Sequence, residues 1–218
     1  MDLSVAVYDL ACGGAWASGE DRTYVTASVV KVAVLAALLL GARDSGRWLT
    51  AGEEHLAEAM IERSDNEAAT ALRAAAGGVA GLDAAHARLG MTRTSAAPAW
   101  GLTRTTARDQ LTLLKAVFAG PDAAASGGLD ERSRRYLAGL MGRVVPGQDW
   151  GISAAATDGD WALKNGWLPR GDSGLWVVHS VGRVRNCLVA VLSDGHPTKD
   201  AGIARVEQAA VSAVRRFV

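Results

Sequence analysis

The stretch Ser28-Val29-Val30-Lys31 decides the fold of this chain, because a hydroxyl and an amine stand three residues apart at the start of a long apolar helix. Residues three apart share a helical face, so the two groups are close enough to exchange a proton. A serine becomes a nucleophile when a neighbouring base takes its proton, and a lysine is a base only when uncharged. Lowering a lysine pKa to near neutrality takes about 3 units from burial and a nearby cation. Lys164 is a candidate for that second cation.

Two further triplets strengthen this interpretation. Ser64-Asp65-Asn66 opens a second helical stretch, and Lys164-Asn165-Gly166 ends a short apolar strand. The order of the three motifs resembles the serine β-lactamase and penicillin-binding family, whose signature is S-x-x-K, S-D-N and K-T-G. The chain is most similar to the class A β-lactamase branch. The resemblance covers nearly the whole chain, roughly from Leu3 to Val211.

The pattern along the chain predicts an α+β fold, with one antiparallel sheet built from both termini and flanked by helices. Residues 1–27 and 151–218 would form the sheet subdomain, and residues 28–150 an inserted all-helical subdomain, with the active site in the cleft between them. Thr50 is expected to cap a helix, with Glu53 completing a capping box. Strands are expected at 3–10, 16–18, 154–156, 161–164, 175–184 and 187–192, and helices at 28–42, 67–76, 81–89, 106–118, 131–141 and 201–217.

The family resemblance implies the catalytic roles. Ser28 would attack a carbonyl carbon, Lys31 would relay its proton, and Ser64 would pass that proton to the leaving nitrogen. Lys164 would add positive charge to the cleft. The backbone N–H groups of Ser28 and Trp167 would form the oxyanion hole, in which one donor contributes about 3 to 4 kcal/mol to transition-state stabilisation.

The family resemblance also assigns a second set of residues to substrate binding. Asn66 would hydrogen-bond the amide of a substrate side chain, whereas Asp65 would fix its own loop. The third motif is K-N-G instead of K-T-G, so Asn165 is expected to donate to a substrate carboxylate with a different reach. The remaining substrate-binding candidates are Gly166, Trp167 beside Lys164, and Arg170, whose guanidinium could bind a carboxylate bidentately; among the other tryptophans, Trp100, Trp150 and Trp176 could also line the cleft.

One absence bears on the reaction. Residues 84–108 contain no Asp or Glu, although class A enzymes carry their deacylating glutamate on a loop in that region. General-base assistance is typically worth about 10²- to 10⁴-fold. We therefore expect acylation to outrun deacylation, unless Lys31 serves as the second base or the nearest acid, Asp109, folds back toward the site.

The composition and residue spacing disfavour several classes of partner. Basic and acidic residues balance at 23 each, which disfavours nucleic acid. The four histidines (His55, His86, His179 and His196) lack metal-binding spacing, so neither a metal nor a cofactor is expected. The apolar run Val32–Leu40 is too short for a membrane span, which needs about 20 residues. The resemblance implies a bacterial protein located outside the cytoplasm or secreted. It also places Cys12 and Cys187 near each other, where a disulfide could form.

Three functions remain open from the sequence. The first is a serine hydrolase that forms an acyl-enzyme with β-lactams or with peptidoglycan-like peptides ending in D-Ala-D-Ala. The second is a sensing domain that is acylated once, although such sensors usually adjoin a membrane helix. The third is a broad esterase or amidase that uses the same serine.

Overall fold

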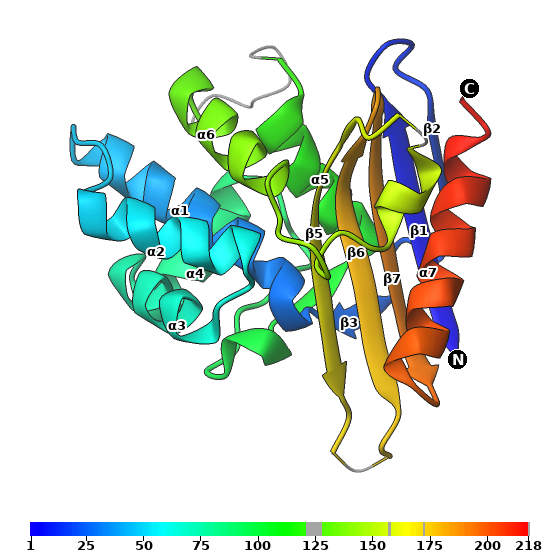
Figure 1. Ribbon diagram of the computed structural model, residues 1–218. Helices are drawn as coiled ribbons and strands as arrows, with labels where there is room; N and C mark the ends of the chain where they lie inside the picture. The colour runs from blue at the N-terminus through cyan, green and yellow to red at the C-terminus, as the bar shows by residue number, and fades with distance from the viewer. Residues whose placement is uncertain (121–127, 157, 172, 218) are drawn as a thin grey trace.

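The computed structural model describes residues 1–120, 128–156, 158–171 and 173–217. Its main sheet is antiparallel and has the strand order β2-β1-β7-β6-β5, so strands from the two ends of the chain lie side by side (Figure 1). The α+β fold predicted from the sequence is confirmed. The strands are β1 (Asp2–Asp9), β2 (Ala15–Ser18), β5 (Trp161–Pro169), β6 (Trp176–Val184) and β7 (Cys187–His196).

Helices cover both faces of this sheet. The last helix, α7, lies against the outer face, α5 and α6 contact the inner face, and α1 to α4 lie farther out on that same side (Figure 1). Because α5 falls within residues 28–150 but packs on the sheet, the helical part is not separate from it. The helices are α1 (Val30–Asp44), α2 (Ala51–Glu62), α3 (Asn66–Ala75), α4 (Gly78–Arg88), α5 (Ala107–Phe118), α6 (Glu131–Met141) and α7 (Lys199–Val214).

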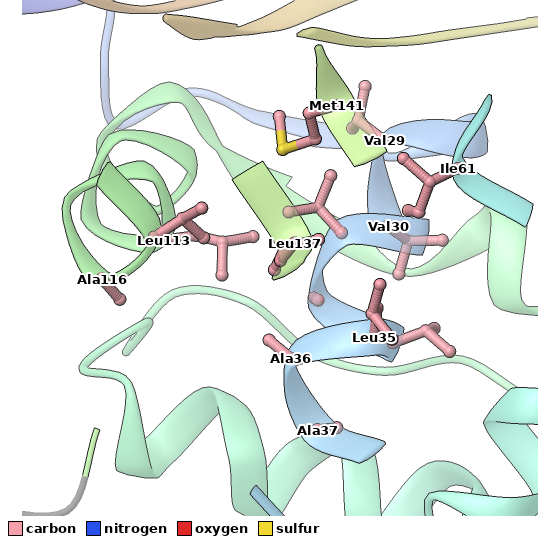
Figure 2. Packing of buried hydrophobic residues seen from close by; sticks show 14 of the residues in the cluster. Val29, Val30, Leu35, Ala36, Ala37, Ile61, Leu113, Ala116, Leu137 and Met141 are labelled. Carbon is pink, nitrogen blue, oxygen red and sulfur yellow. The ribbon is translucent and has the colours of Figure 1, made fainter. Parts of the chain in front are cut away.

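The apolar run after Lys31 becomes the centre of the molecule. Every residue from Val30 to Leu40 is buried in α1, and Figure 2 shows Val30 and Leu35 packed among side chains from other elements, including Ile61, Leu113 and Leu137. Fully burying one such side chain is worth about 1.5 to 3 kcal/mol. This burial holds α1 rigidly in place, and with it the two reactive groups at its start. No helix among the described residues is both long and apolar enough to cross a membrane.

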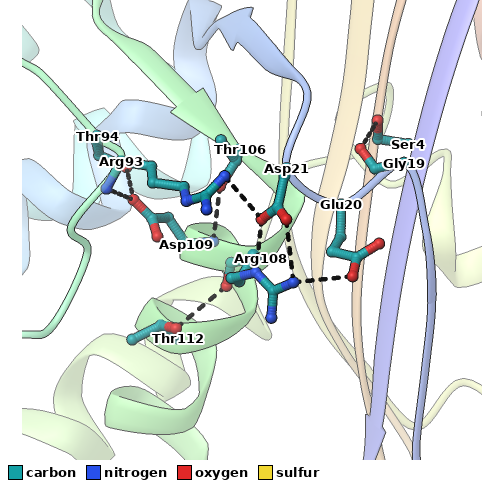
Figure 3. Close-up of polar contacts among 10 residues, drawn as sticks. All are labelled: Ser4, Gly19, Glu20, Asp21, Arg93, Thr94, Thr106, Arg108, Asp109 and Thr112. Atoms are coloured by element: carbon teal, nitrogen blue, oxygen red, sulfur yellow. Dashed lines mark hydrogen bonds and ion pairs between the residues drawn. The ribbon is translucent and has the colours of Figure 1, made fainter.

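A second, two-stranded sheet leads into the reactive stretch. It pairs β3 (Thr23–Val25) with β4 (Arg104–Thr106) and was not expected from the sequence. Ion pairs hold the turn before β3 against α5: Arg108 contacts both Glu20 and Asp21, and Arg93 also contacts Asp21 (Figure 3). The segment before Ser28 is therefore fixed to the body of the molecule.

Two expectations about local structure are wrong. Of the strand expected at 154–156, the first two residues belong to a 3₁₀ turn, Ile152–Ala155, that packs between α7 and the sheet, and Ala156 is the cap of that turn. The expected disulfide is absent, because Cys12 and Cys187 are both free thiols. Strand register places Cys187 opposite Asp9, whose carboxylate accepts hydrogen bonds from the backbone N–H groups of Ala11 and Cys12. Asp9 thus holds the turn that carries Cys12.

Candidate active site

Ser28 lies in a 3₁₀ turn, Ala27–Val29, immediately before α1. Ala27 has a φ of +46°, a left-handed conformation that L-residues with a side chain avoid and that is common at functional sites. Gly166 of β5 presses directly against this turn. A Cβ at Gly166 would lie 2.8 Å from the backbone nitrogens of both Ser28 and Val29. Only glycine therefore allows the edge of the sheet to approach the candidate nucleophile this closely.

Lys31 is fully buried one turn further along and binds the second motif. Its Nζ lies 2.6 Å from Ser64 O, 2.8 Å from Asn66 Oδ1 and 3.2 Å from Ser64 Oγ. Burial lowers the pKa of Lys31 to about 8, while the charge of Asp65 opposes this shift. A neutral amine is thus accessible near physiological pH, as a base for Ser28 requires.

Ser64 lies between two amines. Its Oγ is 3.2 Å from Lys31 Nζ and 2.9 Å from Lys164 Nζ. Burial is the main cause that lowers the pKa of Lys164 well below the usual value of a lysine, and repulsion by the charge of Lys31 lowers it further. Two ammonium groups bonded to one hydroxyl repel each other, so the pair favours losing a proton. Ser64 itself has a φ of +59°, a second strained residue at the same site.

Within the Ser64-Asp65-Asn66 triplet, Asp65 has the structural role that the sequence predicted for it. Asp65 is the N-cap of α3, and its Oδ1 accepts a hydrogen bond from the Ala68 backbone N–H at 2.7 Å. Asn66 Oδ1 accepts from Lys31, which fixes the orientation of the amide because an ammonium or amine N–H must donate to oxygen. The Asn66 NH₂ group therefore points away from Lys31.

Asn165 does not share the face of β5 that carries Lys164, contrary to the expectation that it binds a substrate carboxylate beside that lysine. Side chains alternate along a strand, so Lys164 and Gly166 share one face of β5 while Asn165 lies on the other. Its Nδ2 donates to Gln148 O at 2.9 Å and to Trp150 O at 2.7 Å. Both amide hydrogens are used, and Asn165 holds the 148–150 loop against the sheet.

The side chain of Trp167 follows the same alternation and also lies on the face of β5 opposite Lys164. Its ring packs 5.7 Å from that of Trp150, and Lys199 Nζ lies 3.9 Å from its centroid. The backbone N–H of Trp167, one residue past Gly166, is the part of this residue that remains a candidate for the oxyanion hole. Arg170 is exposed in the turn after β5, six residues after Lys164 in the chain.

Trp100 is the aromatic residue that the structure brings to the site. Lys31 Nζ lies 4.9 Å from the centroid of its ring, within the range of a cation–π contact. Its Nε1 donates to Thr70 Oγ1 at 3.2 Å, which ties the ring to α3. The sequence indicated Trp167 in preference to Trp100, because proximity in the chain to Lys164 was the only available signal.

The loop that carries Trp100 is anchored without placing a carboxylate at Lys31. Asp109 is buried at the start of α5, where its Oδ2 accepts from the Arg93 N–H at 2.8 Å and from Thr94 Oγ1 at 2.6 Å (Figure 3). Asp109 therefore secures the beginning of the loop. The middle of the loop is held at Pro98, whose carbonyl accepts from Arg73. No cluster of three or more potential metal ligands occurs among the described residues.

A sheet formed from both termini, a helical layer and a Ser–x–x–Lys turn at their junction define the β-lactamase and DD-peptidase class of serine hydrolases. Comparisons with known proteins agree with this class. A family described as the Beta-lactamase enzyme family matches residues 49–217. The chain belongs to this family, and its structural neighbours are class A β-lactamases and PBP-A.

The relatives found by sequence are distant, and so is PBP-A, a solved structure with a similar fold. The candidate lipoprotein LppW of Mycobacterium bovis and Mycobacterium tuberculosis is 30% identical over 175 residues, covering 76% of this chain and 54% of LppW. The chain thus spans about half the length of these curated relatives. PBP-A has a TM-score of 0.81 at 20% identity, over 99% of this chain and 89% of that chain.

Two further solved structures extend the comparison. An ancestral class A β-lactamase (GNCA) has a TM-score of 0.76 at 26% identity, over 99% of this chain and 94% of that chain. A mutant of PBP-A, solved as an acyl-enzyme complex with penicillin G, has a TM-score of 0.78 at 22% identity, over 99% and 90% of the two chains.

Proposed function

We propose that this protein is a serine hydrolase that is acylated at Ser28 by β-lactams or by peptides resembling D-Ala-D-Ala. The observation that carries the proposal is the position of Ser64 Oγ between Lys31 and Lys164, at 3.2 and 2.9 Å. Both amines donate to Ser64 Oγ, so the single lone pair of a neutral Lys31 stays available for the proton of Ser28. This arrangement supports a path for one proton across the site.

In the proposed reaction, neutral Lys31 takes the proton of Ser28 as Ser28 Oγ attacks the carbonyl carbon. The backbone N–H groups of Ser28 and Trp167 stabilise the oxyanion. Ser64 then delivers a proton to the departing nitrogen and regains one from Lys31. Asn66 donates to a carbonyl of the substrate, and the charge near Lys164 attracts a substrate carboxylate. The product is an acyl-enzyme at Ser28.

Hydrolysis of that acyl-enzyme is the slow step in this proposal. Trp100 covers Lys31 from the loop where class A enzymes place their glutamate, and an indole has no basic atom with which to activate water. Asp109 is bonded to the start of the loop. We therefore expect a burst of one equivalent followed by slow release. Turnover of hundreds per second on a simple penicillin would contradict this and would point to another base.

The test of the proposed function is intact-mass measurement after exposure to penicillin G. The wild-type protein should gain the mass of one penicillin, and Ser28→Ala should gain none. Ser212→Ala removes an exposed serine on α7 and is the matched control. Labelling that persists in Ser28→Ala would refute the assignment.

The substrate class is tested by steady-state turnover of a chromogenic cephalosporin, a D-Ala-D-Ala peptide and a thioester. Labelling without turnover of any of the three would favour the sensing alternative, and turnover of the thioester alone would favour the esterase. The name of LppW supports a location outside the cytoplasm for this chain as well.

A further inference from the structure

The backbone that delivers Ser28 is strained and needs support from its surroundings. Ala27, directly before Ser28, is in the left-handed region, which residues with a side chain rarely adopt. On one side the Thr26 N–H donates to Thr103 O at 2.8 Å, which joins the turn to the loop before β4. On the other side the carbonyl of Val25, the last residue of β3, is bonded to a histidine of the main sheet.

That histidine is His179 of β6, which is fully buried. Its Nε2 lies 2.8 Å from Val25 O, and its Nδ1 accepts a hydrogen bond from the Ser193 backbone N–H at 3.1 Å. A carbonyl needs a donor and an N–H needs an acceptor, so only the neutral tautomer with the proton on Nε2 satisfies both partners. The Tyr24 ring packs edge-on against it at 5.8 Å.

Burial lowers the pKa of His179 to about 4, and the nearby His196 acts in the same direction. At neutral pH the ring is therefore uncharged and carries one N–H, in agreement with the hydrogen-bond pattern. His179 also pairs across the sheet with Gly166, the residue that presses on the Ser28 turn. His179 thus links the segment before Ser28 through its ring and the Gly166 strand through the sheet pairing.

We propose that His179 is a positioning residue for Ser28, whose neutral ring ties the end of β3 to β6 and β7 and so holds the strained turn in its reactive position. This inference rests on the proposed role of Ser28 as the nucleophile. His179 acts through the Val25 carbonyl and takes no part in the bond changes. A misplacement of reacting atoms by about 1 Å can cost on the order of 100-fold in rate.

The experiment compares three variants with the wild-type protein. His179→Leu removes the bridge, and His179→Gln keeps one N–H donor and one carbonyl acceptor at a similar reach. His86→Leu is the matched control, because His86 is a buried histidine of α4 whose Nδ1 lies 3.4 Å from Asp83 on the same helix. For each protein, the acylation rate by penicillin G is resolved into a limiting rate and a half-saturating concentration. Backbone amide NMR shifts of residues 26–29 report the turn directly.

The inference predicts that His179→Leu lowers the limiting acylation rate about 10- to 100-fold with little change in half-saturation. His179→Gln should recover most of the rate, and His86→Leu should leave it unchanged. The amide shifts of residues 26–29 should move in His179→Leu alone. A wild-type rate in His179→Leu, or an equal loss in His86→Leu, overturns the inference.

The amide shifts separate this inference from the proposed function. If wild-type protein is not acylated, the proposed function fails, and His179 is judged by the shifts alone; unmoved shifts in His179→Leu then overturn the positioning role. If His179→Leu does not fold, the ring nitrogens of His179 in the wild-type protein decide by nitrogen-15 NMR. A slowly exchanging proton on Nε2 supports the role, and a proton on Nδ1 overturns it.

Discussion

At the scale of single residues, the site depends on burying two amines that would be more stable in water. Lys31 and Lys164 are both fully buried, and a buried ammonium is favourable only with good partners. Lys31 has three oxygen acceptors, which compensate part of this cost. The part of the burial cost that these acceptors do not compensate lowers the pKa of Lys31. This lowered pKa makes Lys31 a usable base.

The first prediction follows from the Lys31 pKa of about 8. Only the neutral amine accepts a proton from Ser28, and its fraction is about one tenth at pH 7 and about nine tenths at pH 9. The acylation rate by penicillin G should therefore rise about tenfold per pH unit below pH 8 and level off above pH 9. Rapid-quench mass measurements from pH 6 to 10 check this. A rate independent of pH in that range would exclude Lys31 as the base.

At the scale of elements, local sequence signals such as capping residues predict where a helix begins, as α2 shows. Thr50 caps α2 with the predicted box: Glu53 N–H donates to Thr50 Oγ1 at 3.2 Å, and the Thr50 N–H donates to Glu53 Oε2 at 2.7 Å. Arg47 adds a bidentate contact that helps to lower the pKa of Glu53 to about 2. This box could be predicted from the sequence because a capping box spans only four consecutive residues.

The second prediction concerns that cap. Thr50→Ala should lower the free energy of unfolding by about 1 kcal/mol, because the Glu53 N–H loses its acceptor. Urea denaturation at pH 7 measures the change. Thr112→Ala, a threonine within α5, removes no cap and should be close to neutral. Equal effects of the two substitutions would show that the box contributes nothing.

The third prediction concerns Asn165 and the loop that it holds. Asn165→Ala should destabilise the protein by about 1 to 3 kcal/mol, because the carbonyls of Gln148 and Trp150 lose their donors. Hydrogen exchange of the amides at 148–152 should accelerate. Gln208→Ala, which removes an exposed amide on α7, is the control. If Asn165→Ala instead weakened only substrate binding, with the loop unchanged, its assignment to the loop would be wrong.

At the scale of the whole molecule, the site lies where the helical layer meets the sheet. The long buried helix α1 and the turn before it bring Lys31 and Ser28, α3 brings Asn66, and β5 brings Lys164. Because these elements are packed together, the lysines stay buried only while the fold is intact. Stability and reactivity are therefore linked through the protonation of Lys31.

The fourth prediction uses that linkage. The pKa of Lys31 is 10.5 when unfolded and about 8 when folded, so between these values the unfolded chain binds more protons and stability rises with pH. Relative to Lys31→Met, the wild-type free energy of unfolding should be constant below pH 8 and gain up to about 3 kcal/mol toward pH 10.5. Denaturation of both proteins from pH 6 to 10 tests this. A difference that falls as the pH rises would have the wrong sign.

The sequence by itself determined the features that depend on neighbouring residues. The helical position of Lys31 one turn after Ser28, the box at Thr50 and the sheet formed from both termini all follow from spacing and periodicity. The conclusion that Ser64 and Lys164 belong with Lys31 came from the order of the motifs, and the structure places the two amines and the hydroxyl together.

Only the tertiary structure decided which face of β5 lies toward Lys31 and Ser64, and which loop residue reaches Lys31. Asn165 and Trp167 are adjacent to Lys164 and Gly166 in sequence but lie on the far face, because side chains alternate along a strand. Trp100 and His179 are distant in sequence and reach the site through contacts across the fold. Such contacts depend on the packing of elements far apart in the chain, which no local pattern of residues encodes.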